Sequence, residues 1–260
     1  MITSVSNDRV KYVRALSRRK MRQEEGRFVV EGVRLIEEAV HANVQPEQIF
    51  YTADVGTRGQ KLAERLHAGG VVCLEVTPGI MRVCSEAETP PGILAVLPMP
   101  ATSLPLHPTL SLVADALRDP GNLGTLLRTA AASGCDEVLL GPGTVDVYNP
   151  KVIRVAMGAH FRLPMAAMTW PGITSHLSGL EIWLADAHAP TSAHYATVDW
   201  TRPSAVIIGG EAEGASAEAA SLATGRVSIP MQRGIESLNA AVAAAIILFE
   251  AMRQRTAQGK

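Results

Sequence analysis

The sequence of 260 residues has few cysteines, almost no net charge and no long apolar run. The cysteines are three, Cys73, Cys84 and Cys135, and they show no CxxC spacing. An odd number without that spacing argues against a disulfide framework and against a zinc site. The longest apolar stretch, 240–249, is too short to cross a bilayer, and the first residues contain no apolar signal segment. We therefore expect a cytoplasmic protein with no membrane partner.

Several ligand and nucleophile motifs are also missing. The chain has no GxGxxG fingerprint and no lysine that follows a glycine-rich loop, so neither a dinucleotide site nor a P-loop is indicated. Its seven histidines do not have metal-ligand spacing, and we expect no metal. His188 and His194 lie in a segment that reads as a solvated loop. No Ser-His-Asp arrangement is visible in the sequence.

Charge is distributed unevenly although the formal net charge is only −1. Residues 1–22 contain a single acid, Asp8, and seven basic residues: Arg9, Lys11, Arg14, Arg18, Arg19, Lys20 and Arg22. A basic arm on a near-neutral body favours a local anionic partner, most often nucleic acid. The alternative is a solvated helix face that is rich in arginine.

Alternating strand and helix patterns predict an α/β fold in two domains. The segment 98–108 contains four prolines, Pro98, Pro100, Pro105 and Pro108, and reads as a linker. We place a small N-terminal α/β domain at 1–100, the linker at 101–108 and a second α/β domain at 109–260. Near-continuous apolar strands such as 206–208 suit a parallel sheet that is buried on both faces.

Three loops in the second domain follow strands and carry glycine with polar residues. They are "RDPGN" (118–122), "GGEAEG" (209–214) and "PMQRGIESLN" (230–239). Ligands bind at the carboxyl ends of strands in open α/β sheets, so these loops mark a candidate site. Each loop alone is a weak signal, and three of them in one domain are a stronger one.

The candidate residues in these loops each have a plain structural alternative. Asn122 could be a helix N-cap, and Ser237 could cap a final helix over 237–255 with Asn239 in its first turn. Glu211 could be a solvated loop acid, as could Glu213. Arg128 lies on the second turn of an apolar predicted helix, where its side chain must reach solvent or bind an anion.

Together the motifs "DPGNLGTLLRTAAASG", "IIGGEAEG" and "IPMQRGIESLNAAVAAAIILFEAMRQR" resemble the three signature motifs of the SpoU/TrmH family. This family comprises RNA 2′-O-ribose methyltransferases of the SPOUT class, which use S-adenosylmethionine. The connecting segment "VYNPKVIRVAMGAHFRLP" is similar to the family's, and "FVVEGVRLIEEA" resembles the small ribosomal-protein-like RNA-binding domain of its ribosomal-RNA members. The resemblance covers nearly the whole chain.

The resemblance implies a C-terminal SPOUT-type domain with a deep trefoil knot, which spacing alone does not indicate. It implies catalytic roles for Arg128, Asn122, Glu211, Ser237 and Asn239, and cofactor contacts from Gly209, Ile229, Met231 and Leu238. The chain departs from the family pattern at Arg233, where glycine is usual, and at Ala241 and Ala156, where serine is common.

The expected function is 2′-O-methylation of RNA, with 23S ribosomal RNA as the leading substrate. A homodimer is expected through the 237–255 helix, where Leu238, Val242, Ile246 and Phe249 form an apolar stripe. Alternatives are a catalytically silent RNA-binding or ribosome-assembly protein of the same fold, a tRNA 2′-O-methyltransferase, and a Rossmann-type oxidoreductase. Arg128 could act as the base or could hold a substrate phosphate, and the sequence leaves both roles open.

Overall fold

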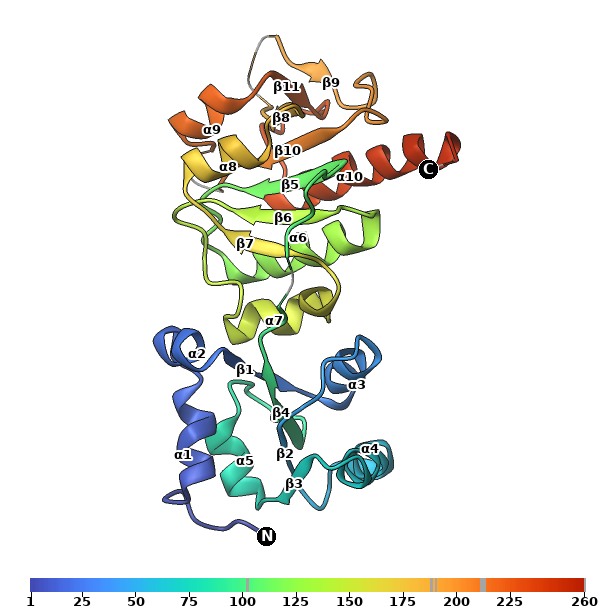
Figure 1. Ribbon diagram of the computed structural model, residues 1–260. Helices are drawn as coiled ribbons and strands as arrows, with labels where there is room; N and C mark the ends of the chain where they lie inside the picture. The colour runs from blue at the N-terminus through green and yellow to red at the C-terminus, as the bar shows by residue number, and fades with distance from the viewer. Residues whose placement is uncertain (102, 188, 190, 211–213, 260) are drawn as a thin grey trace. The chain divides into compact units, whose positions relative to one another are not determined.

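The computed structural model describes the chain except for residues 102, 188, 190, 211–213 and 260 (Figure 1). The chain divides into two compact units. The first comprises Met1–Ala101 with Tyr148–Phe161, and the second comprises Thr102–Val147 with Arg162–Lys260. Helices alternate with strands in both units, which confirms the predicted α/β class.

The first unit is built on a four-stranded sheet of β1 (Arg27–Glu31), β2 (Gln48–Tyr51), β3 (Val72–Glu75) and β4 (Ile93–Pro98), in the order β1-β4-β2-β3. Strand β4 is antiparallel to both of its neighbours, and β2 is parallel to β3. Alternate residues of β4 enter two different cores: Ile93, Ala95 and Leu97 enter one, and Leu94 and Val96 enter the other. Both faces of this sheet are therefore covered.

Two pairs of helices supply these cores. Leu35 and Ile36 of α3 (Val33–His41) and Leu62 of α4 (Gly56–Ala68) pack on one face. Val13 of α1 (Asp8–Ala15) and Ile80 of α5 (Pro78–Cys84) pack on the other. A second short helix, α2 (Arg19–Glu25), follows α1. Helix α5 was not among the predicted elements, although it begins with an N-cap threonine followed by proline.

A segment from the second half of the sequence belongs to the first unit. Residues Tyr148–Phe161 form α7 (Pro150–Ala156) and the 3₁₀ turn η1 (Ala159–Phe161). Ile153 and Phe161 join the core beside Phe28, and the rings of Tyr148 and Phe28 lie 4.9 Å apart between centroids. The proline-rich stretch is thus not the last point at which the chain passes between the units.

The second unit contains a seven-stranded sheet in the order β7-β6-β5-β10-β8-β11-β9, and every pair in it is parallel. The strands are β5 (Leu110–Ala114), β6 (Glu137–Leu140), β7 (Met165–Ala167), β8 (Glu181–Ala185), β9 (Ala193–His194), β10 (Ser204–Ile208) and β11 (Gly225–Ser228). All residues of β5 and β10 are buried, as predicted for a parallel sheet covered on both faces.

Helices cover both faces of this sheet (Figure 1). On one face, α6 (Pro120–Ser133) packs against the long α10 (Ala240–Ala257). On the other, α8 (Trp170–His176) and α9 (Ala217–Leu222) pack on alternate strand residues; Ile173 and Ala219, for example, lie in one core with Ile207. The elements β7, α8 and β9 were not predicted from the sequence.

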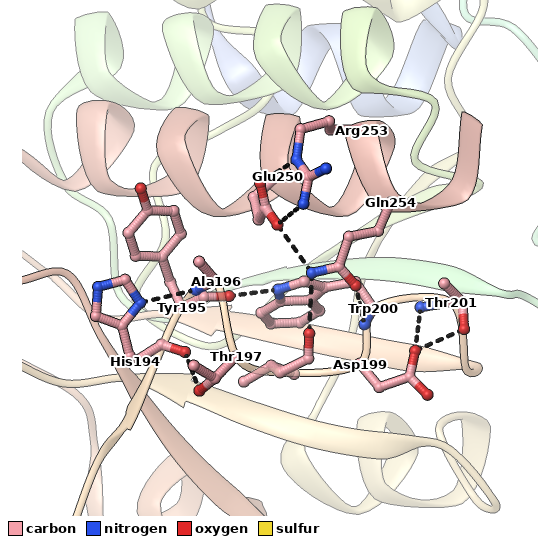
Figure 2. A network of polar contacts seen from close by, with 11 residues as sticks. His194, Tyr195, Ala196, Thr197, Asp199, Trp200, Thr201, Glu250, Arg253 and Gln254 are labelled. Carbon is pink, nitrogen blue, oxygen red and sulfur yellow. Dashed lines mark hydrogen bonds and ion pairs between the residues drawn. The ribbon is translucent and has the colours of Figure 1, made fainter. Parts of the chain in front are cut away.

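A polar network fixes the C-terminal half of α10 against the segment 194–201 (Figure 2). The Gln254 side chain donates to the carbonyl oxygen of Val198 at 3.0 Å and accepts from the Trp200 amide at 3.0 Å. The Trp200 indole N–H in turn donates to the Tyr195 carbonyl at 2.8 Å. Glu250 accepts from both Gln254 and Arg253. The network holds α10 in place at the end farthest from the candidate site.

Candidate functional site

The strand order of the second unit creates a switch point between β5 and β10. From β5 the chain continues to β6 and β7 on one side, whereas β10 occupies the other side of β5. Loops that leave the carboxyl ends of such neighbouring strands diverge, and ligands bind between them. The loop 115–119 leaves β5 and the segment 209–216 leaves β10, so the predicted motifs meet at this edge.

Only glycine fits at the start of the segment that follows β10. A Cβ on Gly209 would lie 2.6 Å from the backbone nitrogen of Ala215, and a Cβ on Gly210 would lie 2.8 Å from the carbonyl oxygen of Ala116. Real Cβ atoms do not approach backbone so closely. The two glycines therefore let this segment double back on itself and touch the loop that leaves β5.

A cavity of about 770 Å³ opens at the carboxyl edge, and we call it the edge cavity. Its wall includes all four residues predicted to contact a cofactor, together with two of the predicted catalytic residues: Gly209, Ile229, Met231, Leu238, Ser237 and Asn239. They come from two segments, the one after β10 and the one between β11 and α10. The structure therefore brings predicted motifs together in one cavity.

One pair of opposite charges lines the edge cavity, and the sequence analysis missed it. Asp186 follows β8, Arg226 lies on the neighbouring strand β11, and the guanidinium donates to the carboxylate. The pair is cross-strand: the Cα partner of Arg226 is Leu184, two residues before Asp186. The signal that could have found Asp186 is its place directly after an apolar strand, at the same edge as the three motifs.

The start of helix α6 excludes the plain structural alternative for Asn122, that of a helix N-cap. Asp119, and not Asn122, is its N-cap, and the Asp119 carboxylate accepts from the backbone N–H of Asn122 at 2.8 Å. The helix starts at Pro120, which has no N–H to satisfy and suits the first position. Because the cap is already filled, the Asn122 side chain is available for another role.

The Asn122 side chain forms a hydrogen bond with Asn239, which lies 117 residues later in the sequence. The Asn239 side-chain N–H donates to the Asn122 side-chain oxygen at 2.8 Å. Asn239 is also the N-cap of α10, where its oxygen accepts from the amides of Ala241 and Val242. Ser237 is therefore not the cap, and the helix begins at Ala240 and not at 237. One amide joins the first motif, the last helix and the cavity wall.

Arg128 lies in the third turn of α6, one turn later than predicted, because the helix starts at Pro120. Its side chain is exposed, while Leu126, Leu127 and Ala130 beside it are buried. It does not line the edge cavity, and it makes no ion pair with any residue that the structure describes. It lies about 9 Å along the helix axis from Asn122, at a rise of about 1.5 Å per residue. Exposure leaves the guanidinium accessible to a large anionic ligand.

A buried carboxylate joins the loop that follows β5 to the segment that follows β10. Asp115 follows β5, is 1 % exposed, and accepts from the Ser216 amide at 2.6 Å through Oδ2. Its Oδ1 has no hydrogen-bond partner in the part of the chain that the structure describes. The Ser216 hydroxyl caps α9. Asp115 thus fixes the far end of the segment 209–216, and the sequence analysis did not identify it.

Three remaining expectations concern Glu211, a metal site and a membrane span. Glu211, the acid of the second motif, lies outside the described residues. Among the described residues, the structure contains no group of three or more His, Cys, Asp or Glu side chains that could hold a metal ion. None of the helices in the described part of the chain has the length and apolarity that a membrane span requires.

Comparisons with known proteins agree with this geometry. Residues 109–249 match the SpoU rRNA Methylase family, and residues 7–95 match the MRM3-like substrate binding domain. The chain is 36% identical over 261 residues to an uncharacterized tRNA/rRNA methyltransferase, slr1673, of Synechocystis, covering 98% of this chain and 94% of the relative. It is 32% identical over 248 residues to the 23S rRNA (guanosine(2553)-2′-O)-methyltransferase RlmP of Bacillus subtilis, with coverage of 95% and 97%.

A solved structure extends the agreement to three dimensions. The AdoMet-bound rRNA methyltransferase from Sinorhizobium meliloti superposes with a TM-score of 0.85 at 28% identity, covering 97% of each chain. The family match spans more than half of the chain, and it includes all three motif loops, two of which line the edge cavity. The family resemblance inferred from the motifs is confirmed, and the chain belongs to the SpoU rRNA methylase family.

Proposed function

We propose that the protein transfers a methyl group from S-adenosylmethionine to a ribose 2′-hydroxyl of ribosomal RNA. The observation that carries the proposal is the edge cavity, which joins Gly209, Leu238 and Asn239 and reaches Asn122 through one hydrogen bond. The relatives support the substrate class: RlmP is a 23S rRNA 2′-O-methyltransferase. We propose that the protein acts in the cytoplasm, where ribosomal RNA is modified.

The cavity fits the cofactor by size and by its lining. Its volume of about 770 Å³ falls within the roughly 300–1,000 Å³ of small-ligand pockets. Gly209 and Gly210 expose backbone that no other residue would leave open, and Ile208, Ile229 and Leu238 offer apolar walls. Gly209, Ile229, Met231 and Leu238 would hold the cofactor. When bound, it supplies an activated methyl group.

The exposed Arg128 is proposed to bind the phosphate next to the target ribose. A guanidinium has donors in a planar fork that matches phosphate, and it is not deprotonated in proteins. We therefore favour the clamp over the base for this residue. The clamp would orient the 2′-hydroxyl for in-line attack, and correct orientation alone lowers a reaction barrier substantially. Asn122, Ser237 and Asn239 would order the cavity rim, and Glu211 keeps its proposed role from the family motif.

The outward face of α10 supports the proposed homodimer. Val242 and Phe249 are each 46 % exposed and Met252 is 39 % exposed, whereas Ala244, Leu248 and Ala251 face inward and are buried. Leu238 does not belong to this stripe, because it precedes the helix and lines the cavity. Exposed apolar faces of this kind mark interaction surfaces. The proposal also keeps the knotted C-terminal segment that the family resemblance implies.

The test uses the full chain, labelled S-adenosylmethionine and ribosomal RNA from a strain that lacks the gene. We expect label on one ribose, recovered as an alkali-resistant dinucleotide, since a 2′-O-methyl group blocks cleavage of the adjacent phosphodiester. Ribosomal RNA from the parent strain is the control and should accept little label, because its site is already methylated. Label on a base, or in tRNA and not in ribosomal RNA, would contradict the proposal.

A further inference from the structure

We infer that the first unit holds one unpaired nucleotide of the RNA in a cleft of about 460 Å³ between α1, β1 and α5. We call it the α1–α5 cleft. The inference rests on the proposed function, because it takes RNA as the substrate. It adds the place in this unit where an RNA strand binds. Four residues of the basic arm line the cleft: Lys11, Arg14, Arg18 and Arg22.

The positive charge of the cleft comes from residues at the turn between α1 and α2, and Arg22 stabilises this turn. Arg22 is 3 % exposed, and its Nη1 donates to the carbonyls of Leu16 at 2.9 Å and Ser17 at 2.6 Å. These carbonyls close the turn between α1 and α2. Arg22 is thus an internal brace and not a surface phosphate contact, which corrects one member of the predicted basic arm. Held by this brace, Arg14 and Arg18 keep fixed places on either side of the turn.

Arg14 and Arg18 are the two cations best placed to receive a phosphate. Both are exposed, and neither is paired with an acid in the part of the chain that the structure describes. Lys11 is already paired with Asp8 at 3.0 Å. Two acids also line the cleft, and Glu31 accepts from the Glu86 amide at 2.9 Å. That leaves two unpaired guanidinium groups at the rim, a match for a phosphodiester.

Part of the cleft wall is apolar and offers a surface on which a base can pack. Val29 of β1, Val83 and Cys84 of α5 and Pro150 of α7 line this part of the cleft, and Val83 is 39 % exposed. Burial raises the pKa of the Cys84 thiol to about 11, so this group is neutral at pH 7. An apolar part of the wall together with cationic side chains in one cleft suits a base that is out of its helix, because a stacked and paired base cannot enter.

The electrostatic half of the inference is tested by removing two positive charges from the cleft and, in a control variant, two from elsewhere on the same unit. Arg14→Ala/Arg18→Ala removes the rim, and Arg19→Ala/Arg34→Ala is the matched control, since both of its arginines are exposed and line no part of the cleft. The probe is a twelve-nucleotide oligouridine, with a twelve-pair RNA duplex beside it, measured by fluorescence anisotropy at several salt concentrations. We expect the cleft variant to bind the single strand at least about tenfold more weakly, with a salt slope smaller by about 1.4 for two lost contacts.

The steric half is tested without any charge change. Val83→Trp fills the cleft, and Val5→Trp, at an exposed position outside it, is the control. We expect Val83→Trp to weaken binding of the single strand and to leave duplex binding unchanged, with unfolding temperatures like those of the control. Unaltered single-strand binding by Val83→Trp would overturn the inference, as would equal losses for the two arginine pairs. If the cleft variants lose binding to a phosphoserine peptide but keep their binding to RNA, the cleft belongs to a protein partner, and the inference is overturned.

These binding measurements need no cofactor and no methyl transfer. If the protein binds single-stranded RNA through the cleft but methylates no RNA, the proposed function fails and the inference stands. If it methylates ribosomal RNA and the cleft variant keeps its KM for that RNA, the inference fails and the function stands. With both correct, Arg14→Ala/Arg18→Ala raises KM and leaves kcat near the wild-type value.

Discussion

The edge cavity and the α1–α5 cleft differ in the balance of charge among the residues that line them. The edge cavity is larger, about 770 Å³, and among the described residues of its wall the charged side chains are Asp186 and Arg226, which pair with each other. The cleft is about 460 Å³, and basic residues outnumber acids in its wall. In our proposals one site selects a small ligand by shape and exposed backbone, and the other attracts a polyanion by charge. These proposals assign the two recognition tasks to different units.

The sharpest test of this division is Arg128→Ala. Arg128 lies outside the edge cavity, so we expect cofactor affinity to stay near wild type while methyl transfer falls by roughly 10²–10⁴-fold, the range for a lost catalytic group. Calorimetry measures the first quantity and labelled methyl transfer the second. Arg128→Lys keeps the charge but not the planar fork, so little rescue indicates a bidentate clamp. If Arg128→Ala turns over at a rate close to that of the wild type, Arg128 is a solvated helix residue without a catalytic role.

Gly209→Ala tests whether shape governs the edge cavity. The added Cβ would meet backbone 2.6 Å away, and overpacking of this kind costs about 1–3 kcal/mol. We expect cofactor affinity to fall by about 5–150-fold in calorimetry, with single-stranded RNA binding unchanged. Gly79→Ala is the control, because its Cβ would meet only the Thr77 hydroxyl at 3.8 Å. Equal cofactor affinity in both variants would show that the glycine is not required there.

The exposed face of α10 sharpens the comparison further, since the cavity unit offers an apolar face where the cleft unit offers charge. Phe249→Glu places a carboxylate in the middle of that face. We expect the dimer dissociation constant to rise at least about tenfold, because a buried unpaired charge is strongly unfavourable. Light scattering should then approach 27.6 kDa. Leu106→Glu, at an exposed site off this helix, should remain dimeric; a wild-type chain that is monomeric at micromolar concentration would contradict the interface.

The smallest expected effect concerns the network at the far end of α10. Hydrogen bonds from Arg253, and then from Gln254, lower the pKa of Glu250 from 4.5 to about 2. Its ionised form therefore adds stability above about pH 4.5, and this contribution is lost as the pH falls toward 2. We expect Glu250→Gln to lower the free energy of unfolding at pH 7 by less than about 1 kcal/mol.

Urea unfolding at several pH values measures that difference. It should shrink between pH 4.5 and 2, where the wild-type carboxylate takes up its proton. Glu24→Gln, which breaks an exposed pair with Lys20 in the first unit, is the matched control. A Glu250→Gln difference that stays constant down to pH 2 would show that the charge of Glu250 is not what the network uses.

Sequence reasoning located the edge cavity because its wall is made of motif residues. Gly209, Leu238 and Asn239 lie in loops that local signals mark, and the family resemblance supplied their expected roles. Asp186 had a local signal in its place after an apolar strand, but its pairing with Arg226 had none, since the two residues are 40 positions apart on neighbouring strands. The capping alternative for Asn122 stayed open in the sequence because Asp119 and Asn122 are both good caps, and Pro120 decides between them.

The fold shows the same limit. The parallel sheet followed from apolar strands that alternate with helices. The return of Tyr148–Phe161 to the first unit did not, because it depends on Phe28 and Ile153 meeting in a core that no periodicity reveals. Short elements such as β7 and β9 carry too few residues for a pattern.

The hydrogen bond between Asn122 and Asn239 also sets a schedule for synthesis. The two side chains are separated by 117 residues, and chains grow at roughly 5–20 residues per second. The first motif therefore waits roughly 6–23 s on the ribosome before its partner has even been made. Most of the first unit can fold during that time, but the edge cavity cannot be completed until the last helix has emerged. The proposed RNA-binding unit is thus made before the proposed methyl-transfer site is complete.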